Sequence, residues 1–206
     1  MLTAKSDFRV PPQTATIGMW LFLASLAMLF AASMFGYAFI RLMGPHSPDV
    51  GTVHMPALLW LSTILVLAAS GTIHLASRAV RAERQTELRR YLLITLLLAA
   101  AFVAVQTPAM ISLIGQHFDN VRAAVALNDG VTSAPANRIY GLVFFLVLVH
   151  ALHVLGGIVS LAWVTYRANR NAYDHESFGG VKHAAMYWHF LDVVWLVMFG
   201  TLFLVG

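Results

Sequence analysis

The sequence contains no cysteine among its 206 residues. This absence excludes a disulfide framework, a thiolate metal site and thiol chemistry. Charge is also scarce, because charged residues make up 11% of the chain, against about 25% in a typical soluble domain. Apolar residues reach 59%, and the mean hydropathy is +0.74. These values exclude a soluble enzyme with a hydrated surface, a disordered chain and a nucleic-acid-binding module, and they indicate an integral membrane protein.

Five stretches are apolar enough, and long enough, to cross a bilayer as helices, which takes about 20 residues each. They cover residues 17–40, 57–77, 91–115, 139–166 and 184–205. Residues 1–16 are polar and carry Pro11 and Pro12, which is untypical of a cleaved signal peptide. The sequence therefore predicts an N-terminal segment, residues 1–16, and a single five-helix transmembrane domain, residues 17–206. Pro108 is expected to kink the third span near Ala104, and residues 117–138 are expected to form the longest loop.

The basic residues predict the orientation of the chain in the membrane. Most of the 13 lysines and arginines fall on one predicted side. That side holds Lys5, Arg9, Arg78, Arg81, Arg84, Arg89, Arg90, Arg167, Arg170 and Lys182, and the other holds Arg41, Arg122 and Arg138. Because basic loops stay in the cytoplasm, this distribution predicts a cytoplasmic N-terminus and a C-terminus outside. The excess of basic residues is thus a topology signal and gives no indication of a nucleic-acid partner.

Ionisable and amide side chains inside the spans are costly in lipid, so they are functional candidates by default. They are His74, Gln106, His150, His153, His189 and Asp192. Each of the pairs His150/His153 and His189/Asp192 is three residues apart and so shares a helix face. Metal binding, haem binding, a proton relay and plain interhelical hydrogen bonds all remain open. A di-iron site is disfavoured because it needs Glu-x-x-His pairs and no span contains Glu.

Three further features have structural interpretations. Gly156 and Gly157 predict a close helix-packing face in the fourth span. Tyr187 and Trp188, at the start of the fifth span, are expected to form part of an aromatic belt. Asp192 is expected to face protein and to be neutralised by a hydrogen bond to a neighbouring helix or to a buried histidine, since a bare charge at that depth would cost several kcal/mol.

Three strings in the spans point to one protein family. Residues 187–196 read YWHFLDVVWL, residues 144–157 read FFLVLVHALHVLGG, and residues 18–25 read GMWLFLAS. These strings resemble subunit III of the haem-copper terminal oxidases in its five-helix bacterial form. Gln106 lies where a glutamine recurs in that family, and Trp188 and Trp195 belong to the first string. The resemblance covers about residues 12–206.

The resemblance implies a V-shaped bundle in the bacterial inner membrane, packed on subunit I of an oxidase that also contains subunit II. It implies no catalytic residue, metal ligand or cofactor in this chain, since the haems and copper lie in the partner subunits. It also implies bound phospholipid, with His153 and Arg167 at positions that contact a lipid phosphate. The implied role is to support O2 reduction coupled to proton transfer, with cytochrome c or quinol as the electron donor.

The chain departs from the family pattern at three positions that usually carry a carboxylate, now Leu26, Ala109 and Lys182. These departures leave room for an accessory protein of a nitric oxide reductase. Another alternative is a small membrane haem or quinone-reactive protein that uses the four intramembrane histidines. A transporter is a weaker alternative, because Asp192 is the sole acid within the spans.

Overall fold

The computed structural model describes residues 12–43, 58–126, 134–170, 173 and 178–205. These residues form the helices α1 (Pro12–Met43), α2 (Leu58–Arg81), α3 (Gln85–Ala126), α4 (Ala134–Asn169) and α5 (Gly179–Val205). Each helix contains a stretch long and apolar enough to cross a bilayer. No strand occurs in the described ranges. The predicted all-α membrane bundle of five helices is confirmed.

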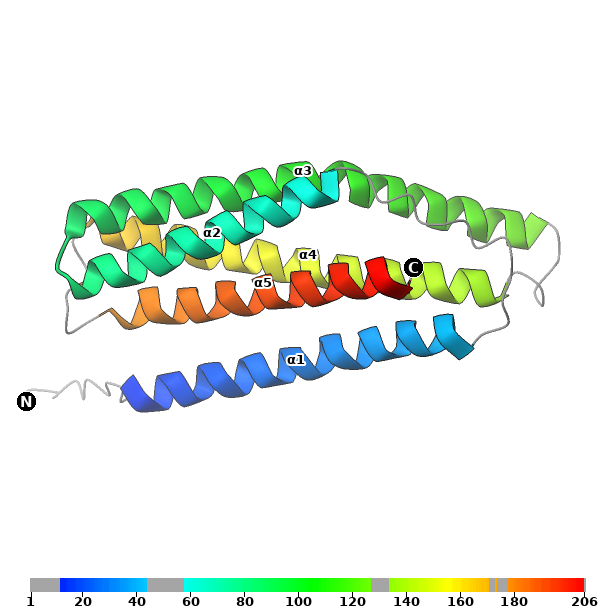
Figure 1. Ribbon diagram of the computed structural model, residues 1–206, viewed down its shortest axis with the longest axis horizontal. Coiled ribbons are helices and arrows are strands. Elements are labelled where there is room, and N and C mark those ends of the chain that lie inside the picture. Colours follow the sequence, from blue (N-terminus) through cyan, green and yellow to red (C-terminus); the bar gives the residue numbers. More distant parts are fainter. Residues whose placement is uncertain (1–11, 44–57, 127–133, 171–172, 174–177, 206) are drawn as a thin grey trace, which may run out of the picture.

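The largest departure from the predicted boundaries is in α3, which continues to Ala126 and is 42 residues long. The predicted loop is therefore wrong over residues 117–126 and 134–138, while Asn128, Asp129 and Gly130 lie outside the described residues. The alanine-rich end of α3 favours a helix even though it is too polar for a span. Pro108 lies inside this helix, and the axis of α3 changes direction near its middle, as predicted (Figure 1).

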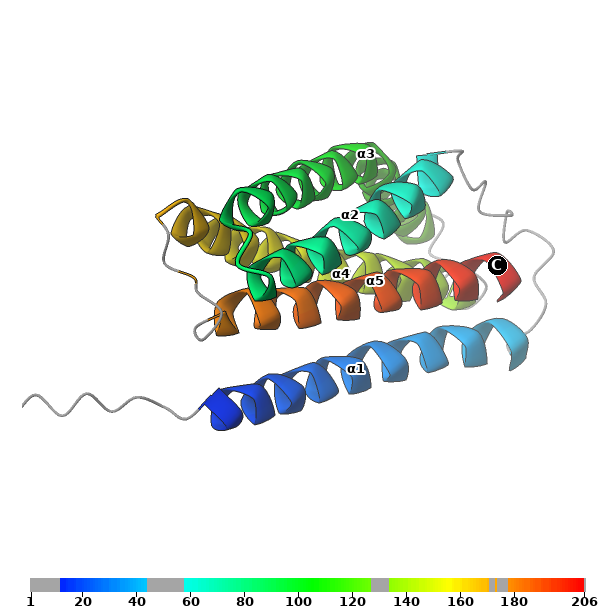
Figure 2. The ribbon, with the colours of Figure 1, turned by 60° about the vertical axis from the view of Figure 1, so that its left-hand side comes forward.

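The helices form three layers (Figures 1 and 2). α4 and α5 lie in the middle, α1 covers one side, and α2 and α3 cover the other. Accordingly α1 contacts α4 and α5, α2 contacts α3 and α5, and α3 contacts α2 and α4. α5 is therefore the helix against which α1, α2 and α4 all pack. Polar residues of α5 can therefore contact residues of α1, α2 or α4.

A tight turn joins α2 to α3 and fixes the polar end of α2. Glu83 has a φ of 59°, and the amides of Glu83 and Arg84 donate to the carbonyls of Val80 and Ala79 at 3.3 and 3.0 Å. This pattern is a Schellman motif, which satisfies carbonyls left free at a helix C-terminus. This turn, the end of α4 and the start of α5 all lie at the same end of the bundle (Figure 1).

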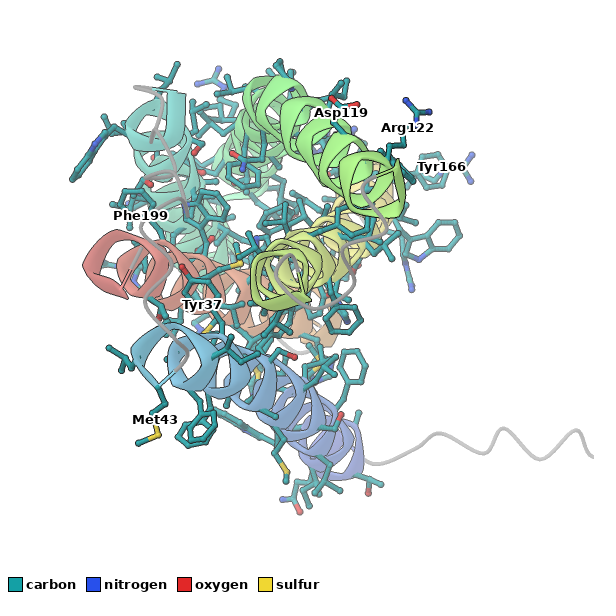
Figure 3. All side chains as sticks on the ribbon, turned by 90° about the vertical axis from the view of Figure 1, so that its right-hand side faces the viewer. Tyr37, Met43, Asp119, Arg122, Tyr166 and Phe199 are labelled. Carbon is teal, nitrogen blue, oxygen red and sulfur yellow. The ribbon has the colours of Figure 1, made fainter. Side chains whose placement is uncertain are left out.

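Apolar side chains lie both inside the bundle and on its outer surface, as expected for a protein that faces lipid. Viewed along the bundle, Tyr37 points to the interior and Met43 points away from it (Figure 3). Leu23 and Phe30 of α1, Ile73 of α2 and Leu161 of α4 are among the buried residues. Large exposed apolar residues such as Trp20, Ile64, Leu97 and Val159 ring the outer faces.

Candidate functional site

A groove of about 550 Å³ runs between α1, α4 and the start of α5. Arg167, near the end of α4, lies at its polar end, together with His183. The other lining residues are mostly apolar or small and include Met19, Phe22, Gly156, Ser160 and Trp163. A cation at one end of a largely apolar groove suits an amphipathic ligand with an anionic head and a hydrocarbon tail.

Tyr173, in the connection between α4 and α5, positions Arg167. The guanidinium carbon of Arg167 lies 5.7 Å from the centroid of the Tyr173 ring, and the Tyr173 carbonyl accepts a hydrogen bond of 2.8 Å from Gln85 Nε2. Burial raises the pKa of the Tyr173 phenol, and the Arg167 guanidinium opposes that rise. The phenol therefore stays neutral and does not neutralise Arg167. Tyr173 was not predicted from the sequence, although an aromatic residue shortly after a helix-end arginine was an available signal.

His153 does not line this groove with Arg167. Its Nδ1 lies 2.7 Å from the carbonyl oxygen of Val149 on its own helix, and its ring centroid is 5.6 Å from that of Phe30. The carbonyl of His153 accepts a hydrogen bond of 2.9 Å from the Tyr187 hydroxyl. The two residues assigned to lipid by resemblance are therefore separated, and a direct contact of His153 with a ligand is limited to Nε2.

A polar seam joins α2 to α5. His189 Nδ1 lies 2.8 Å from Ser70 Oγ and 3.9 Å from Asp192 Oδ2, and the His74 and His189 rings are 6.3 Å apart. Asp192 is 5% exposed, so the prediction that it faces protein is confirmed. The Ser70 hydroxyl of the neighbouring helix α2 is a hydrogen-bonding group beside the Asp192 carboxyl, although neither carboxylate oxygen has a partner of good geometry in the described structure.

The hydroxyl group of Thr63, two helical turns from Ser70 on α2, extends the same seam. Trp195 Nε1 donates a buried hydrogen bond of 3.2 Å to Thr63 Oγ1, which fixes the indole plane. On the other side of α2, Thr72 and Thr95 pair their hydroxyls at 2.8 Å. Sequence reasoning missed Ser70 and Thr63, because serine and threonine are common in apolar helices and carry no distinguishing pattern.

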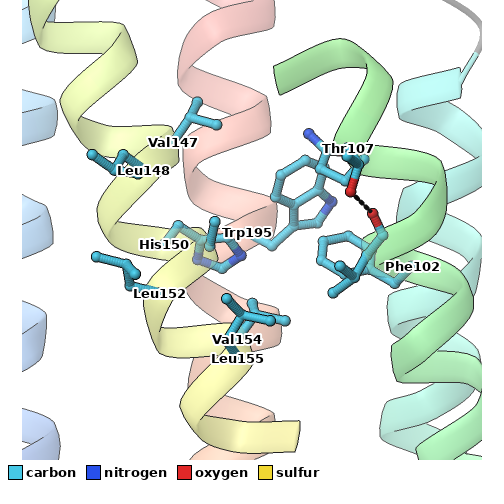
Figure 4. Close-up of a pocket in the computed structure, with 12 residues that line it drawn as sticks. Phe102, Thr107, Val147, Leu148, His150, Leu152, Val154, Leu155 and Trp195 are labelled. Atoms are coloured by element: carbon cyan, nitrogen blue, oxygen red, sulfur yellow. Dashed lines mark hydrogen bonds between the residues drawn. The ribbon is translucent and has the colours of Figure 1, made fainter. Parts of the chain in front are cut away.

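His150 and Gln106 line a second cavity, of about 180 Å³, between α3, α4 and α5 (Figure 4). The His150 ring lies 5.6 Å from Trp195, whose indole meets Phe102 edge-on at 5.2 Å. His150 is 4% exposed, and its Nδ1 has no hydrogen-bond partner in the described part of the chain. The walls are almost entirely apolar, so the cavity suits a small apolar molecule better than water, which needs two to four polar partners.

Tyr187 and Trp188 correct one prediction. Both are buried, so they belong to the interior of the bundle and do not form a membrane-facing aromatic belt. A Cβ atom added at Gly157 would lie 3.1 Å from Tyr187 Cε1 and 3.4 Å from Trp188 Cζ2. Gly157 therefore allows α4 to approach these rings, as predicted, whereas the neighbouring Gly156 is exposed.

The positions that lack family carboxylates lie in different surroundings. Leu26 is buried in the core of the bundle, so no charge is available on that face of α1. Lys182 is exposed in the first turn of α5, and the side chain of Ala109 lies outside the described structure. In the described ranges no three His, Asp or Glu side chains come together as a possible metal site.

The sequence was also compared with known proteins. Residues 9–206 match the family described as cytochrome c oxidase subunit III. This chain belongs to the cytochrome c oxidase subunit III family. The five apolar helices indicate a multi-pass membrane protein. Family members are named as subunits of oxidases, which implies that this chain is part of a multi-subunit complex.

Three relatives illustrate the range of this cytochrome c oxidase subunit III family. Cytochrome c oxidase subunit 3 of Thermostichus vulcanus is 28% identical over 96% of this chain and 88% of its own length. Cytochrome bo(3) ubiquinol oxidase subunit 3 of Pseudomonas putida is 27% identical over 94% of this chain and 87% of its own. Cytochrome c oxidase subunit 3 of Pylaiella littoralis is 31% identical over 93% of this chain and 66% of its own. The predicted membership of the subunit III family is confirmed.

Proposed function

We propose that this chain is the non-catalytic subunit III of a bacterial haem-copper terminal oxidase. The observation that carries the proposal is the family match over residues 9–206, together with a bundle whose five helices can all span a membrane. In this role the chain packs on subunit I in the inner membrane, and the haems and copper lie in the partner subunits. It supports O2 reduction and the coupled proton transfer by stabilising the complex.

Within that role, the groove at Arg167 holds a phospholipid. The guanidinium can form two parallel hydrogen bonds to a phosphate, and the apolar walls around Met19, Phe22 and Trp163 suit an acyl chain. Tyr173 supports the guanidinium from one side. His153 lies outside the lining of this groove, so any contact it makes is with a part of the lipid that extends beyond the groove, and Nε2 is the available atom because Nδ1 lies 2.7 Å from the Val149 carbonyl oxygen.

The assignment of the complex is tested by purifying the tagged chain from native membranes in mild detergent. The co-purifying chains are identified by mass, and a reduced-minus-oxidised spectrum is recorded. A large haem-bearing oxidase subunit I is the expected partner. Recovery of a nitric oxide reductase subunit instead would favour the accessory-protein alternative, and an isolated chain with its own Soret band would favour a haem protein. Recovery of the chain alone and colourless would contradict all complex-based roles.

The lipid assignment is tested separately by native mass spectrometry of Arg167→Ala. Loss of one phospholipid per chain is expected, because the phosphate loses its bidentate partner. Arg170→Ala is the matched control. Arg170 lies three residues further along at the same end of the bundle, where its guanidinium stacks on Tyr166 at 4.7 Å, and it does not line the groove. A full phospholipid complement in Arg167→Ala would contradict the assignment.

A further inference from the structure

A second basic pocket lies on the other side of α5, between the end of α2 and the start of α5. Its volume is about 230 Å³. Arg78, Arg81 and Lys182 line it together with His74 and His189, and none of its described lining residues is acidic. The remaining lining residues are Ser77, Phe178, Ala185 and Met186. Three permanent cations and two histidines thus meet around one small volume.

The three cations differ in how well their positions suit a positive charge. Arg78 and Arg81 occupy the last turn of α2, where the helix dipole favours positive charge, and Arg81 stacks over the Phe178 ring at 5.7 Å. Lys182 is different, because it lies in the first turn of α5, where the dipole disfavours a cation. The resemblance to subunit III led us to expect an acid at this position. An anion bound in the pocket would relieve the unfavourable placement of Lys182.

The floor of the pocket provides further hydrogen-bonding groups. His189 Nδ1 is engaged by Ser70 at 2.8 Å, so Nε2 is the ring atom that can meet a ligand. The buried Ser77 hydroxyl oxygen has no hydrogen-bond partner among the residues that the structure describes. A phosphate group, with several acceptor oxygens, can accept from the Ser77 hydroxyl, and from His189 Nε2 in the tautomer in which Ser70 donates to Nδ1, while the cations neutralise its charge.

The surface beyond the pocket indicates that the phosphate is carried by a lipid. On α2, a row of exposed residues at helical spacing leads from the pocket toward the start of the helix, and its members beyond Gly71 are large and apolar. The row consists of His74, Gly71, Leu67, Ile64 and Trp60. On α5, the corresponding exposed residues are Val193, Leu196 and Val197. These two stripes flank the seam between the helices and form an apolar track that leads away from the basic pocket. Basic pockets next to apolar tracks of this kind bind anionic lipid headgroups.

We propose that the pocket between the end of α2 and the start of α5 binds the phosphate of an anionic phospholipid, whose acyl chains lie along the α2–α5 seam. This site is separate from the groove at Arg167, because the two pockets share no lining residue. The proposed lipid site requires only that the chain lies in a membrane, so it does not depend on which complex contains the chain.

The proposal is tested with the full chain, purified with its partners in mild detergent and stripped of weakly held lipid. Binding of dioleoyl phosphatidylglycerol and of dioleoyl phosphatidylcholine is measured by native mass spectrometry. Arg78→Gln/Lys182→Gln is the test variant. Arg90→Gln/Arg170→Gln is the control, since it removes the same charge from exposed positions at the same end of the bundle that line neither pocket.

The wild type is expected to retain one more phosphatidylglycerol per chain than the test variant and to prefer it over phosphatidylcholine. The apparent affinity of the test variant should fall about 25-fold, roughly fivefold for each juxtamembrane cation removed. The control should match the wild type, and Arg167→Ala should lose a different lipid additively. Lys182→Glu, which reverses a charge on the exposed surface, provides a second variant and should also lose the lipid.

Two results would overturn the proposal. The first is equal retention of phosphatidylglycerol by the test variant and the wild type. The second is protection of the wild type against thermal unfolding by millimolar inorganic phosphate without protection by phosphatidylglycerol, because the pocket would then take a soluble anion.

Discussion

His189 Nδ1 and Ser70 Oγ lie 2.8 Å apart, and this contact joins α5 to α2 inside the bundle. Asp192 Oδ2 lies 3.9 Å from the same nitrogen, which is too far for a hydrogen bond. The Ser70 hydroxyl on the neighbouring helix thus holds the histidine at close range, while its contact with the Asp192 carboxyl is loose. Removing the Ser70 hydroxyl and removing the Asp192 carboxyl should therefore change the stability of the bundle in opposite directions.

Ser70→Ala is expected to lower the free energy of unfolding in detergent by about 0.6 kcal/mol, and by no more than about 1.7 kcal/mol, the range found for interhelical hydrogen bonds in membranes. Ser33→Ala is the matched control, because the Ser33 hydroxyl donates to the carbonyl of Leu29 on its own helix. The measurement is unfolding monitored by circular dichroism. Equal stability of the two variants would show that the α2–α5 contact contributes nothing.

Asp192→Leu is expected to raise the free energy of unfolding by about 1–3 kcal/mol. The substitution removes two buried oxygens that have no hydrogen-bond partner of good geometry in the described structure. Such groups carry a desolvation cost of that size, which exceeds the contribution of the loose contact with Ser70. The outcome is the opposite of that expected for a neutralised, hydrogen-bonded acid. A fall in stability in the isolated chain would show that the carboxyl group has an internal partner.

Gly157→Val is expected to lower stability by about 1–3 kcal/mol, the usual cost of overpacking. A Cβ there already meets Tyr187 Cε1 at 3.1 Å and Leu191 Cδ1 at 3.3 Å. Gly156→Val is the control, since the nearest atom to a Cβ at that position is the Tyr187 hydroxyl at 3.9 Å. Both substitutions have the same helix propensity cost, so the difference in melting temperature reports the packing of α4 on α5 alone.

His150→Phe is expected to leave the free energy of unfolding unchanged or to raise it by about 1 kcal/mol. Phenylalanine keeps a ring between Phe30 and Trp195 and removes a buried nitrogen that lacks a partner in the described structure. Trp195→Phe provides the contrast, because it removes the hydrogen bond to Thr63 and should be destabilising. A clear loss of stability in His150→Phe would mean that His150 Nδ1 is hydrogen-bonded, for example to water in the cavity.

The sequence predicted the five helices correctly but misjudged where the polar ends of helices stop. Residues 117–126 continue α3, because helix propensity persists after hydropathy has fallen. Among the candidate residues, the pair His189 and Asp192 could be placed on one face from their spacing. The separation of His153 from the Arg167 groove could not, since it depends on how α4 is rotated against α1 and α5.

The sequence by itself determined that this chain is a five-span membrane protein of the subunit III type. A membrane span is recognised from about 20 consecutive apolar residues, and a motif such as YWHFLDVVWL is also a run of consecutive residues. Both are therefore visible in the sequence alone. Only the tertiary structure decided that Trp188 is buried and that Lys182 joins Arg78 and Arg81 around one pocket. Those neighbours are set by the rotation and crossing of helices, which follow from contacts such as that of Gly157 with Tyr187 between residues distant in the sequence.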